Sequence, residues 1–140
     1  MTSGAKQAVC AALVRGTQIM LGKRIASKTL DPLKWSLFGG HIRPNESPED
    51  AIRRELCEEL GVEVAAAHHL GQLREMDAHN RYMTQVYIVT TWRGEPVNLE
   101  EHEEIRWVEL AAMRELDLSP GLVAIIEEMG LVEAIARLTA

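Results

Sequence analysis

The chain has 140 residues and a net charge of −6, with 46% hydrophobic and 26% charged residues. This length fits one ordinary domain, which we expect to span residues 1–140, and the composition is typical of a soluble globular protein. The acidic charge argues against binding of nucleic acid polymers, and no apolar run approaches the roughly 18 residues that cross a membrane. The short polar N-terminus does not resemble a secretory signal, so we expect a cytoplasmic protein with small-molecule partners. The sequence does not indicate an oligomeric state.

The first third of the chain predicts a hairpin, a loop and a short strand. Two apolar runs, 8–14 and 19–24, flank Gly16-Thr17, which is typical of a β-hairpin. Turn-forming residues then indicate a loop over 25–34. Residues 35–38 predict a short strand, and the two glycines that follow should stop it.

The next segment predicts a helix with defined ends. Ser47 suits the N-cap, Pro48 suits the first helical position, and Asp50 completes a capping box. Apolar residues then recur on one face, and Gly61 can close the helix in a left-handed conformation.

The second half of the chain predicts two more strands and a helical end. Residues 81–92 are rich in β-branched and aromatic residues, and apolar residues alternate with polar ones over 104–110. From Pro120 onward apolar residues recur at helical spacing, and Gly130 is placed to kink or split this helix. Strands and helices are interspersed, which indicates an α+β protein.

The predicted central helix carries a cluster of carboxylates. Glu55, Glu58 and Glu59 are spaced i, i+3 and i+4, so they share one face of the helix. Like charges at this spacing destabilise a helix by about 0.2–0.5 kcal/mol per pair, and Arg54 offsets only part of this. Carboxylate oxygens on a rigid element are what Mg²⁺ or Mn²⁺ prefers. A solvated acidic face is the alternative, and it is the commoner meaning of such a cluster alone.

The residues around this cluster resemble the box of the Nudix hydrolases. That motif is G-x5-E-x7-R-E-U-x-E-E-x-G-U, where U is a bulky aliphatic residue. Its nine defining positions are filled here by Gly40, Glu46, Arg54, Glu55, Leu56, Glu58, Glu59, Gly61 and Val62. The resemblance implies an α/β/α sandwich around a mixed β-sheet. It also implies hydrolysis of a phosphoanhydride bond in a nucleoside diphosphate that is linked to another group.

The resemblance also assigns roles to individual residues. The carbonyl of Gly39 and the carboxylates of Glu55, Glu58 and Glu59 would hold Mg²⁺ or Mn²⁺, which would activate a water molecule. Glu55 and Glu59 would thereby serve catalysis directly. Arg54 would orient Glu55 through a charge-assisted hydrogen bond.

Further site residues are predicted outside the box. Some family members place another catalytic carboxylate on a distant loop, and Glu101 is the best-placed candidate in the acidic run 100–104, although a solvated loop is the alternative. Arg24 is a candidate phosphate contact and Trp35 a candidate for stacking on a base, with a surface arginine and a core aromatic as the alternatives. Phe38 stands where many members carry proline, so we expect it to shape the floor of the base pocket.

Comparison with the patterns of known family members narrows the range of candidate substrates. Members that act on ADP-ribose or on dinucleoside polyphosphates often carry a proline or a tyrosine at a set distance past the box, where this chain has Ala78, His79 and Asn80. A nucleoside triphosphate, oxidised or not, cleaved to a monophosphate and pyrophosphate is therefore expected. Some such enzymes have an asparagine before the last helix, which residues 118–121 lack, so we expect broad base tolerance.

Three other functions stay open at this point. The first is a pyrophosphatase for ADP-ribose or a nucleotide sugar. The second is a module that senses a nucleotide without cleaving it, although such a module has no need of so many carboxylate ligands. The third is an isoprenyl diphosphate isomerase, which shares the fold.

Overall fold

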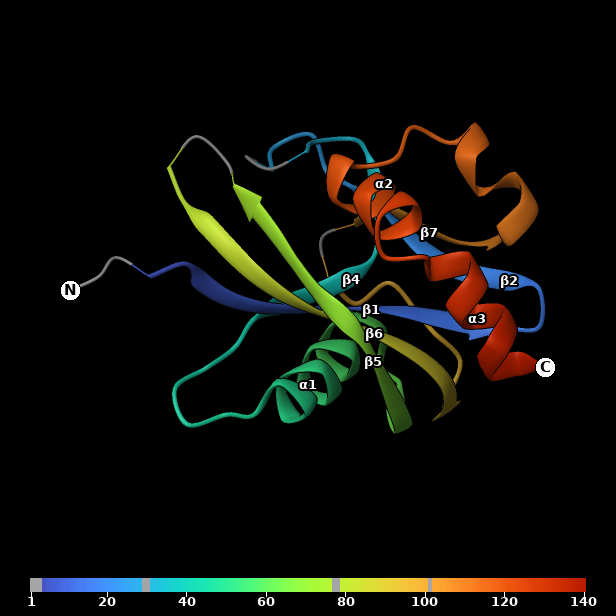
Figure 1. Cartoon of the computed structure of the whole chain (residues 1–140), viewed down its shortest axis with the longest axis horizontal. Helices are drawn as coiled ribbons and strands as arrows, with labels where there is room; N and C mark the ends of the chain where they lie inside the picture. The colour runs from blue at the N-terminus through green and yellow to red at the C-terminus, as the bar shows by residue number, and fades with distance from the viewer. Residues whose placement is uncertain (1–3, 29–30, 77–78, 101) are drawn as a thin grey trace.

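The computed structural model describes residues 4–28, 31–76, 79–100 and 102–140. In this part of the chain a mixed sheet carries helices on both faces (Figure 1). The strands are β1 (Lys6–Arg15), β2 (Gln18–Arg24), β3 (Trp35–Ser36), β4 (Phe38–His41), β5 (Glu63–Met76), β6 (Arg81–Arg93) and β7 (His102–Glu109). The helices are α1 (Pro48–Leu60), α2 (Pro120–Glu127) and α3 (Leu131–Thr139), and a 3-10 helix, η1 (Leu110–Glu115), follows β7.

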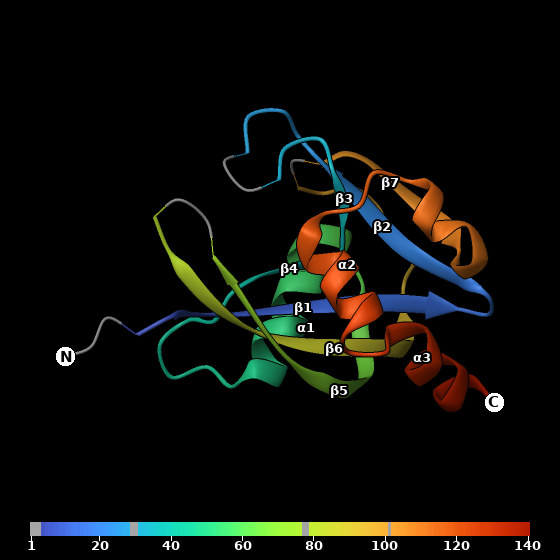
Figure 2. The same cartoon turned by 45° about the horizontal axis from the view of Figure 1, so that its top comes forward.

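The sheet splays apart beside its central strand. Its order is β3-β2-β1-β6-β5, with β4 also paired to β1 and β7 to β2, and β1 and β6 run parallel. β1 and β2 pair only next to their turn, at Val14↔Ile19 and Arg15↔Gln18, and then diverge. β4 instead pairs with the first half of β1, and β2 turns away to pair with β7 (Figure 2). This divergence leaves room for a site between the two parts of the sheet.

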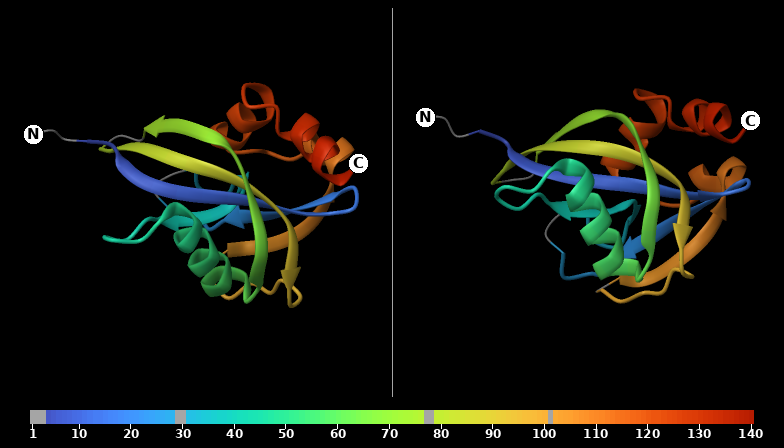
Figure 3. Two further views of the ribbon diagram at one scale, coloured as in Figure 1. Left: turned by 60° about the horizontal axis from the view of Figure 1, so that its bottom comes forward. Right: turned by 90° about the horizontal axis from the view of Figure 1, so that it is seen from below.

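Alternation along the central strands divides the core into two layers. On β1, Val9, Ala11 and Leu13 belong to the apolar cluster beneath α1, whereas Ala12 and Val14 belong to the cluster beneath α2 and α3. The helices accordingly lie on opposite faces of the sheet (Figure 3). A strand with both faces covered buries every residue, which explains why the middle of β1 is an unbroken apolar run. The predicted α/β/α arrangement of an α+β protein is confirmed.

Most of the predicted elements are confirmed with their end signals. The hairpin turns at Gly16, whose φ is 60°, and the hydroxyl of Ser47 caps α1 by accepting a hydrogen bond from the Asp50 N–H (3.1 Å). Gly61 ends α1 in the left-handed region, with φ 70°. Gly130 also has a positive φ of 67°, and it splits the predicted last helix into α2 and α3.

Two predictions about strands were wrong or incomplete. Gly39 and Gly40 do not stop a strand; they lie inside β4, where they pair with Cys10 and Val9 of β1. The 14-residue strand β5 has no clear sequence pattern, and it follows β6 through three register shifts. In the described part of the chain, no helix is long and apolar enough to span a membrane.

Candidate active site

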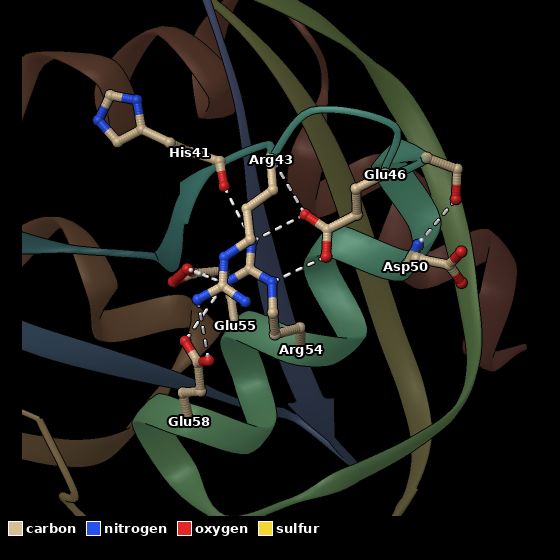
Figure 4. A network of polar contacts seen from close by, with 8 residues as sticks. His41, Arg43, Glu46, Asp50, Arg54, Glu55 and Glu58 are labelled. Atoms are coloured by element: carbon tan, nitrogen blue, oxygen red, sulfur yellow. Dashed lines mark hydrogen bonds and ion pairs between the residues drawn. The ribbon is translucent and has the colours of Figure 1, made fainter.

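The side chain of Arg54 organises the loop before α1 and the helix itself. Its Nε and Nη2 donate to the two carboxylate oxygens of Glu46 (2.8 and 2.9 Å), and Nη2 also donates to the carbonyl of His41 (3.0 Å). Nη1 donates to Glu55 Oε2 (3.0 Å) and Glu58 Oε1 (3.2 Å), as Figure 4 shows. All five N–H groups of the guanidinium are thus used, which a lysine could not reproduce.

Glu46 completes this network from the loop side. Its Oε1 accepts a hydrogen bond from the backbone N–H of Arg43 (3.0 Å), so the loop folds around the carboxylate. The hydrogen bond from Arg54, and next the one from Arg43, lower the pKa of Glu46 to about 2. Glu46 therefore stays ionised and holds Arg54 in place, and Arg54 in turn fixes the direction of Glu55.

Glu55 and Glu59 face a polar cavity of about 210 Å³ next to β4. Gly39 lies on the same cavity wall, together with Arg24, Lys28, Glu100 and His102. The predicted catalytic residues Glu55 and Glu59 of α1 therefore lie at the same cavity as Gly39 of β4. Burial raises the pKa of Glu55 above its ordinary value, and the hydrogen bond from Arg54 only partly opposes this.

Glu59 is the most buried carboxylate of the site. Its Oε2 has no hydrogen-bond partner among the described residues, and its Oε1 lies 3.9 Å from Nε2 of His102. Burial, then the negative charges of Glu55 and Glu100, raise the pKa of Glu59 to about 8. Burial, then Arg24 and Lys28, lower the pKa of His102 to about 4, so its imidazole is neutral at neutral pH and does not compensate Glu59.

Glu58 occupies a different position from the other two box carboxylates. Its oxygens contact Arg54 (3.2 Å) and Arg43 (3.6 Å), its side chain is 41% exposed, and it does not line the cavity. The three carboxylates share a helix face, as expected, but they do not converge on one point: the described residues contain no group of three such side chains placed to hold an ion. The cause is the competition of two arginines for Glu58.

A loop tied to the end of α1 brings further polar groups to the cavity. The backbone N–H of Leu99 donates to the Glu59 carbonyl (3.0 Å), and that of His102 donates to the Glu100 carbonyl (2.9 Å). Glu100 and His102 were not predicted as site residues, because only this long-range packing places them there. The predicted carboxylate Glu101 lies outside the described residues, as does Ala78, one of the three residues used to narrow the substrate.

A second, larger cavity of about 320 Å³ adjoins the carboxylate cavity. The two share Arg24, Lys28 and Gly39 in their walls, so they lie side by side with cationic side chains between them. The larger cavity has a mixed lining: apolar residues alternate with polar and charged ones, among them Asp31, Ser36, Glu75, Thr84 and Ser119. Arg24, predicted to contact phosphate, therefore lies where both cavities meet.

Trp35 and Phe38 are not brought to either cavity, so the prediction that they contact the substrate is not supported. Trp35 is 5% exposed in the core beneath α2, with the guanidinium of Arg106 over its ring at 4.7 Å. Phe38 is 1% exposed and packs on the α1 side, edge-on to His102. The two rings pack into the two core clusters on opposite faces of the sheet, whereas Ser36 and Leu37 between them line the larger cavity.

The residues around Glu59 fit a divalent cation. The buried oxygen of Glu59 lacks a donor, and Glu55 and Glu100 bring more negative charge to the same cavity. Mg²⁺ typically takes one or two carboxylates plus substrate phosphates and keeps several waters, so two carboxylates and a carbonyl are a sufficient protein ligand set. A cation there would also offset the burial and the repulsion that together raise the pKa of Glu59.

Comparisons with known proteins agree with this geometry. The sequence model of the NUDIX domain family matches residues 4–129 of this chain. A Mycobacterium tuberculosis protein named "Putative 8-oxo-dGTP diphosphatase 2" is 33% identical over 114 residues, which cover 81% of this chain and 79% of that protein. The CTP pyrophosphohydrolase of Escherichia coli is 26% identical, covering 86% of this chain and 88% of that enzyme.

Solved structures show the same fold. The MutT NUDIX hydrolase from Burkholderia pseudomallei is 31% identical with a TM-score of 0.73, over 78% of this chain and 86% of that one. The solution structure of the E. coli ORF135 protein is 26% identical with a TM-score of 0.75, over 97% and 91% of the two chains. The complete motif, the Arg54 network, the family match and these structures together show that the chain belongs to the Nudix hydrolase family.

Proposed function

We propose that this protein hydrolyses nucleoside triphosphates between the α and β phosphates, giving a nucleoside monophosphate and pyrophosphate. The observation that carries the proposal is the pair of adjoining cavities, a carboxylate cavity and a larger one of mixed polar and apolar lining, which share Arg24 and Lys28 in their walls. A nucleoside fits the larger part, and a polyphosphate chain fits the junction and the carboxylate part. Relatives named as triphosphate diphosphatases and pyrophosphohydrolases support the same reaction.

Nudix hydrolases use divalent cations, and we propose Mg²⁺, or Mn²⁺ in its place, for this chain. The carbonyl of Gly39 and the carboxylates of Glu55 and Glu59 are the proposed ligands, with Glu58 joining from the rim. When bound, the cation neutralises phosphate charge and lowers the pKa of a bound water. The net negative charge of the protein is no obstacle, because the cation then sets the local sign of the field.

The chain's own residues supply orientation and charge. Arg54 holds Glu55 in one direction by a hydrogen bond of 3.0 Å, which prepares that carboxylate before substrate arrives. Arg24 and Lys28 stand where phosphate oxygens would lie, so they lower the cost of bringing a polyanion to an acidic site. Glu101 remains a proposed catalytic carboxylate, and its neighbour Glu100 lines the cavity.

A substrate panel tests the proposal. Purified protein with Mg²⁺ would be offered nucleoside triphosphates, ADP-ribose, a nucleotide sugar, a dinucleoside polyphosphate and isopentenyl diphosphate, with products separated by ion exchange. We expect pyrophosphate and a monophosphate from a triphosphate, with the highest kcat/KM of the panel. Turnover of ADP-ribose or a nucleotide sugar at least about tenfold more efficient than of every triphosphate, about 1.4 kcal/mol in transition-state binding, would reassign the substrate. Binding without turnover would indicate a sensor.

A further inference from the structure

The larger cavity contains a carboxylate that the hydrolytic mechanism does not use. Glu75 projects from β5 into this cavity, and its side chain is half-buried. It does not line the carboxylate cavity around Glu59, so it is separate from the proposed metal ligands. A carboxylate that is partly withdrawn from water in a cavity favours a ligand that brings donors to it.

The Glu75 carboxylate is held in a fixed place by its neighbours. Its Oε2 accepts a hydrogen bond from the hydroxyl of Thr84 (3.1 Å), a residue on β6 that is only 4% exposed. On the other side the start of α2 packs so closely that a Cβ on Gly121 would lie 2.3 Å from Glu75 Oε1. Glycine at this position therefore leaves the space that Oε1 occupies.

The acceptor capacity of Glu75 is only partly met by the protein. Among the described residues no donor forms a hydrogen bond with Oε1, although the carboxylate can accept several. Burial raises the pKa of Glu75, and the hydrogen bond from Thr84 only partly opposes this effect. A bound ligand that brings N–H donors would supply what the protein lacks.

We propose that Glu75 recognises the base of the substrate by accepting two adjacent N–H groups, which selects a guanine-type ring. An ionised carboxylate only accepts, and its two oxygens suit a pair of parallel donors. Guanine presents its ring imino and exocyclic amino groups side by side. Adenine and cytosine place an acceptor nitrogen next to their amino group, and uracil flanks its single imino group with two carbonyls, so each opposes a lone pair to Glu75.

This inference rests on the proposed triphosphate hydrolysis and adds a base preference to it. Oxidation at C8 of guanine leaves the imino and amino groups unchanged, so an oxidised guanine nucleotide would be accepted equally by Glu75. Broad base tolerance was expected because residues 118–121, the segment before α2, lack an asparagine; that expectation did not include Glu75. Glu75 lies on a different strand, and nothing in its local sequence marks it as a recognition residue.

The test compares kcat/KM for GTP, ITP, ATP, CTP and UTP in the wild type and in Glu75→Gln. ITP lacks the exocyclic amino group and keeps the imino group, so the GTP to ITP ratio isolates the second donor. We expect a wild-type ratio of at least about tenfold, because ITP leaves one acceptor of Glu75 unpaired in the complex. In Glu75→Gln the amide NH₂ meets the donors of guanine, so this ratio should fall to near one through a higher KM for GTP.

Controls separate recognition from folding and from the reaction itself. Glu63→Gln removes an exposed carboxylate from the other end of the same strand, and it should keep the wild-type ratio. Equal melting temperatures would show that Glu75→Gln is folded, and measurable release of pyrophosphate from GTP would show that it is active. A wild-type GTP to ITP ratio near one, or an unchanged ratio in active Glu75→Gln, would overturn the role of Glu75. Failure of every triphosphate to release pyrophosphate would instead contradict the proposed function.

Discussion

The backbone of Gly40 lies directly against the carboxylate of Glu55: a Cβ added to Gly40 would stand 2.5 Å from both of its oxygens. This approach fixes Glu55 between β4 on one side and the guanidinium of Arg54 on the other. The first glycine of the box is thus explained by the space that its absent side chain leaves.

Gly40→Ala should lower kcat while the protein stays folded. The added methyl would displace the Glu55 carboxylate from its hydrogen bond with Arg54, and we expect kcat to fall at least about tenfold, since small misplacements of a catalytic group are costly. Gly4→Ala is the matched control, because nothing lies within 4 Å of a Cβ at Gly4. Steady-state kinetics of both variants decide the matter, and a wild-type kcat for Gly40→Ala would remove Glu55 from the mechanism.

Removing the charge of Glu59 should cost more activity than removing that of Glu58. Glu59 is buried in the cavity with an oxygen that lacks a donor, whereas Glu58 is at the rim and paired with two arginines. We expect Glu59→Gln to lower kcat at least about a hundredfold, the scale of single electrostatic catalytic groups, and Glu58→Gln to lower it less. The order would be read from kcat at saturating Mg²⁺, and the reverse order would place the ion nearer the rim.

The stability of the metal-free protein should fall as pH rises between about 4.5 and 8. The pKa of Glu59 is raised from 4.5 to about 8 in the folded protein, so the folded state binds its proton more tightly than the unfolded state. This contribution is fully present below pH 4.5 and is lost by about pH 8, when Glu59 ionises within the fold.

Thermal melts with a chelator would measure this effect. At pH 8 and above, Glu59→Gln should melt at a higher temperature than the wild type, and the difference should vanish near pH 4.5. Mg²⁺ added at pH 8 should raise the Tm of the wild type and have less effect on the variant. Parallel pH profiles for the two proteins would show that Glu59 is not the group responsible.

The acidic run 100–104, which leads into β7, offers a test of which of its carboxylates serves the site. Glu100 lines the cavity, whereas Glu103 is exposed on β7. We expect Glu100→Gln to lower kcat by about tenfold or more and Glu103→Gln to leave it unchanged, with Glu101→Gln measured beside them. Equal rates for all three variants would make the run a solvated loop.

The helix and its carboxylates could be predicted because their signals are local. Ser47, Asp50 and Gly61 act within one turn of the ends of α1, and the spacing of Glu55 and Glu59 alone places them on one face. The same holds for Gly130, whose left-handed conformation divides the final helical segment. Each of these residues acts on its immediate neighbours, so the printed sequence is enough to identify it.

The rest of the site depends on contacts between distant segments. In the sequence, Gly39 and Gly40 look like the end of a strand. In the fold they pair with β1, and glycine is needed at position 39 because a Cβ there would collide with the Val9 carbonyl. β5 becomes a strand through its pairing with β6, despite its irregular register. Glu75 and His102 reach their cavities only through the topology, so no spacing along the chain could reveal them.

Product analysis of one triphosphate with and without a divalent cation tests the central claim most directly. GTP would be incubated with the protein in ¹⁸O-labelled water, in Mg²⁺ and in excess chelator, and the products identified by mass. The structure predicts GMP and pyrophosphate in Mg²⁺, with one ¹⁸O in one of the two products, and no turnover in chelator. GDP and phosphate as products, or turnover that survives thorough chelation, would contradict metal-dependent cleavage between the α and β phosphates.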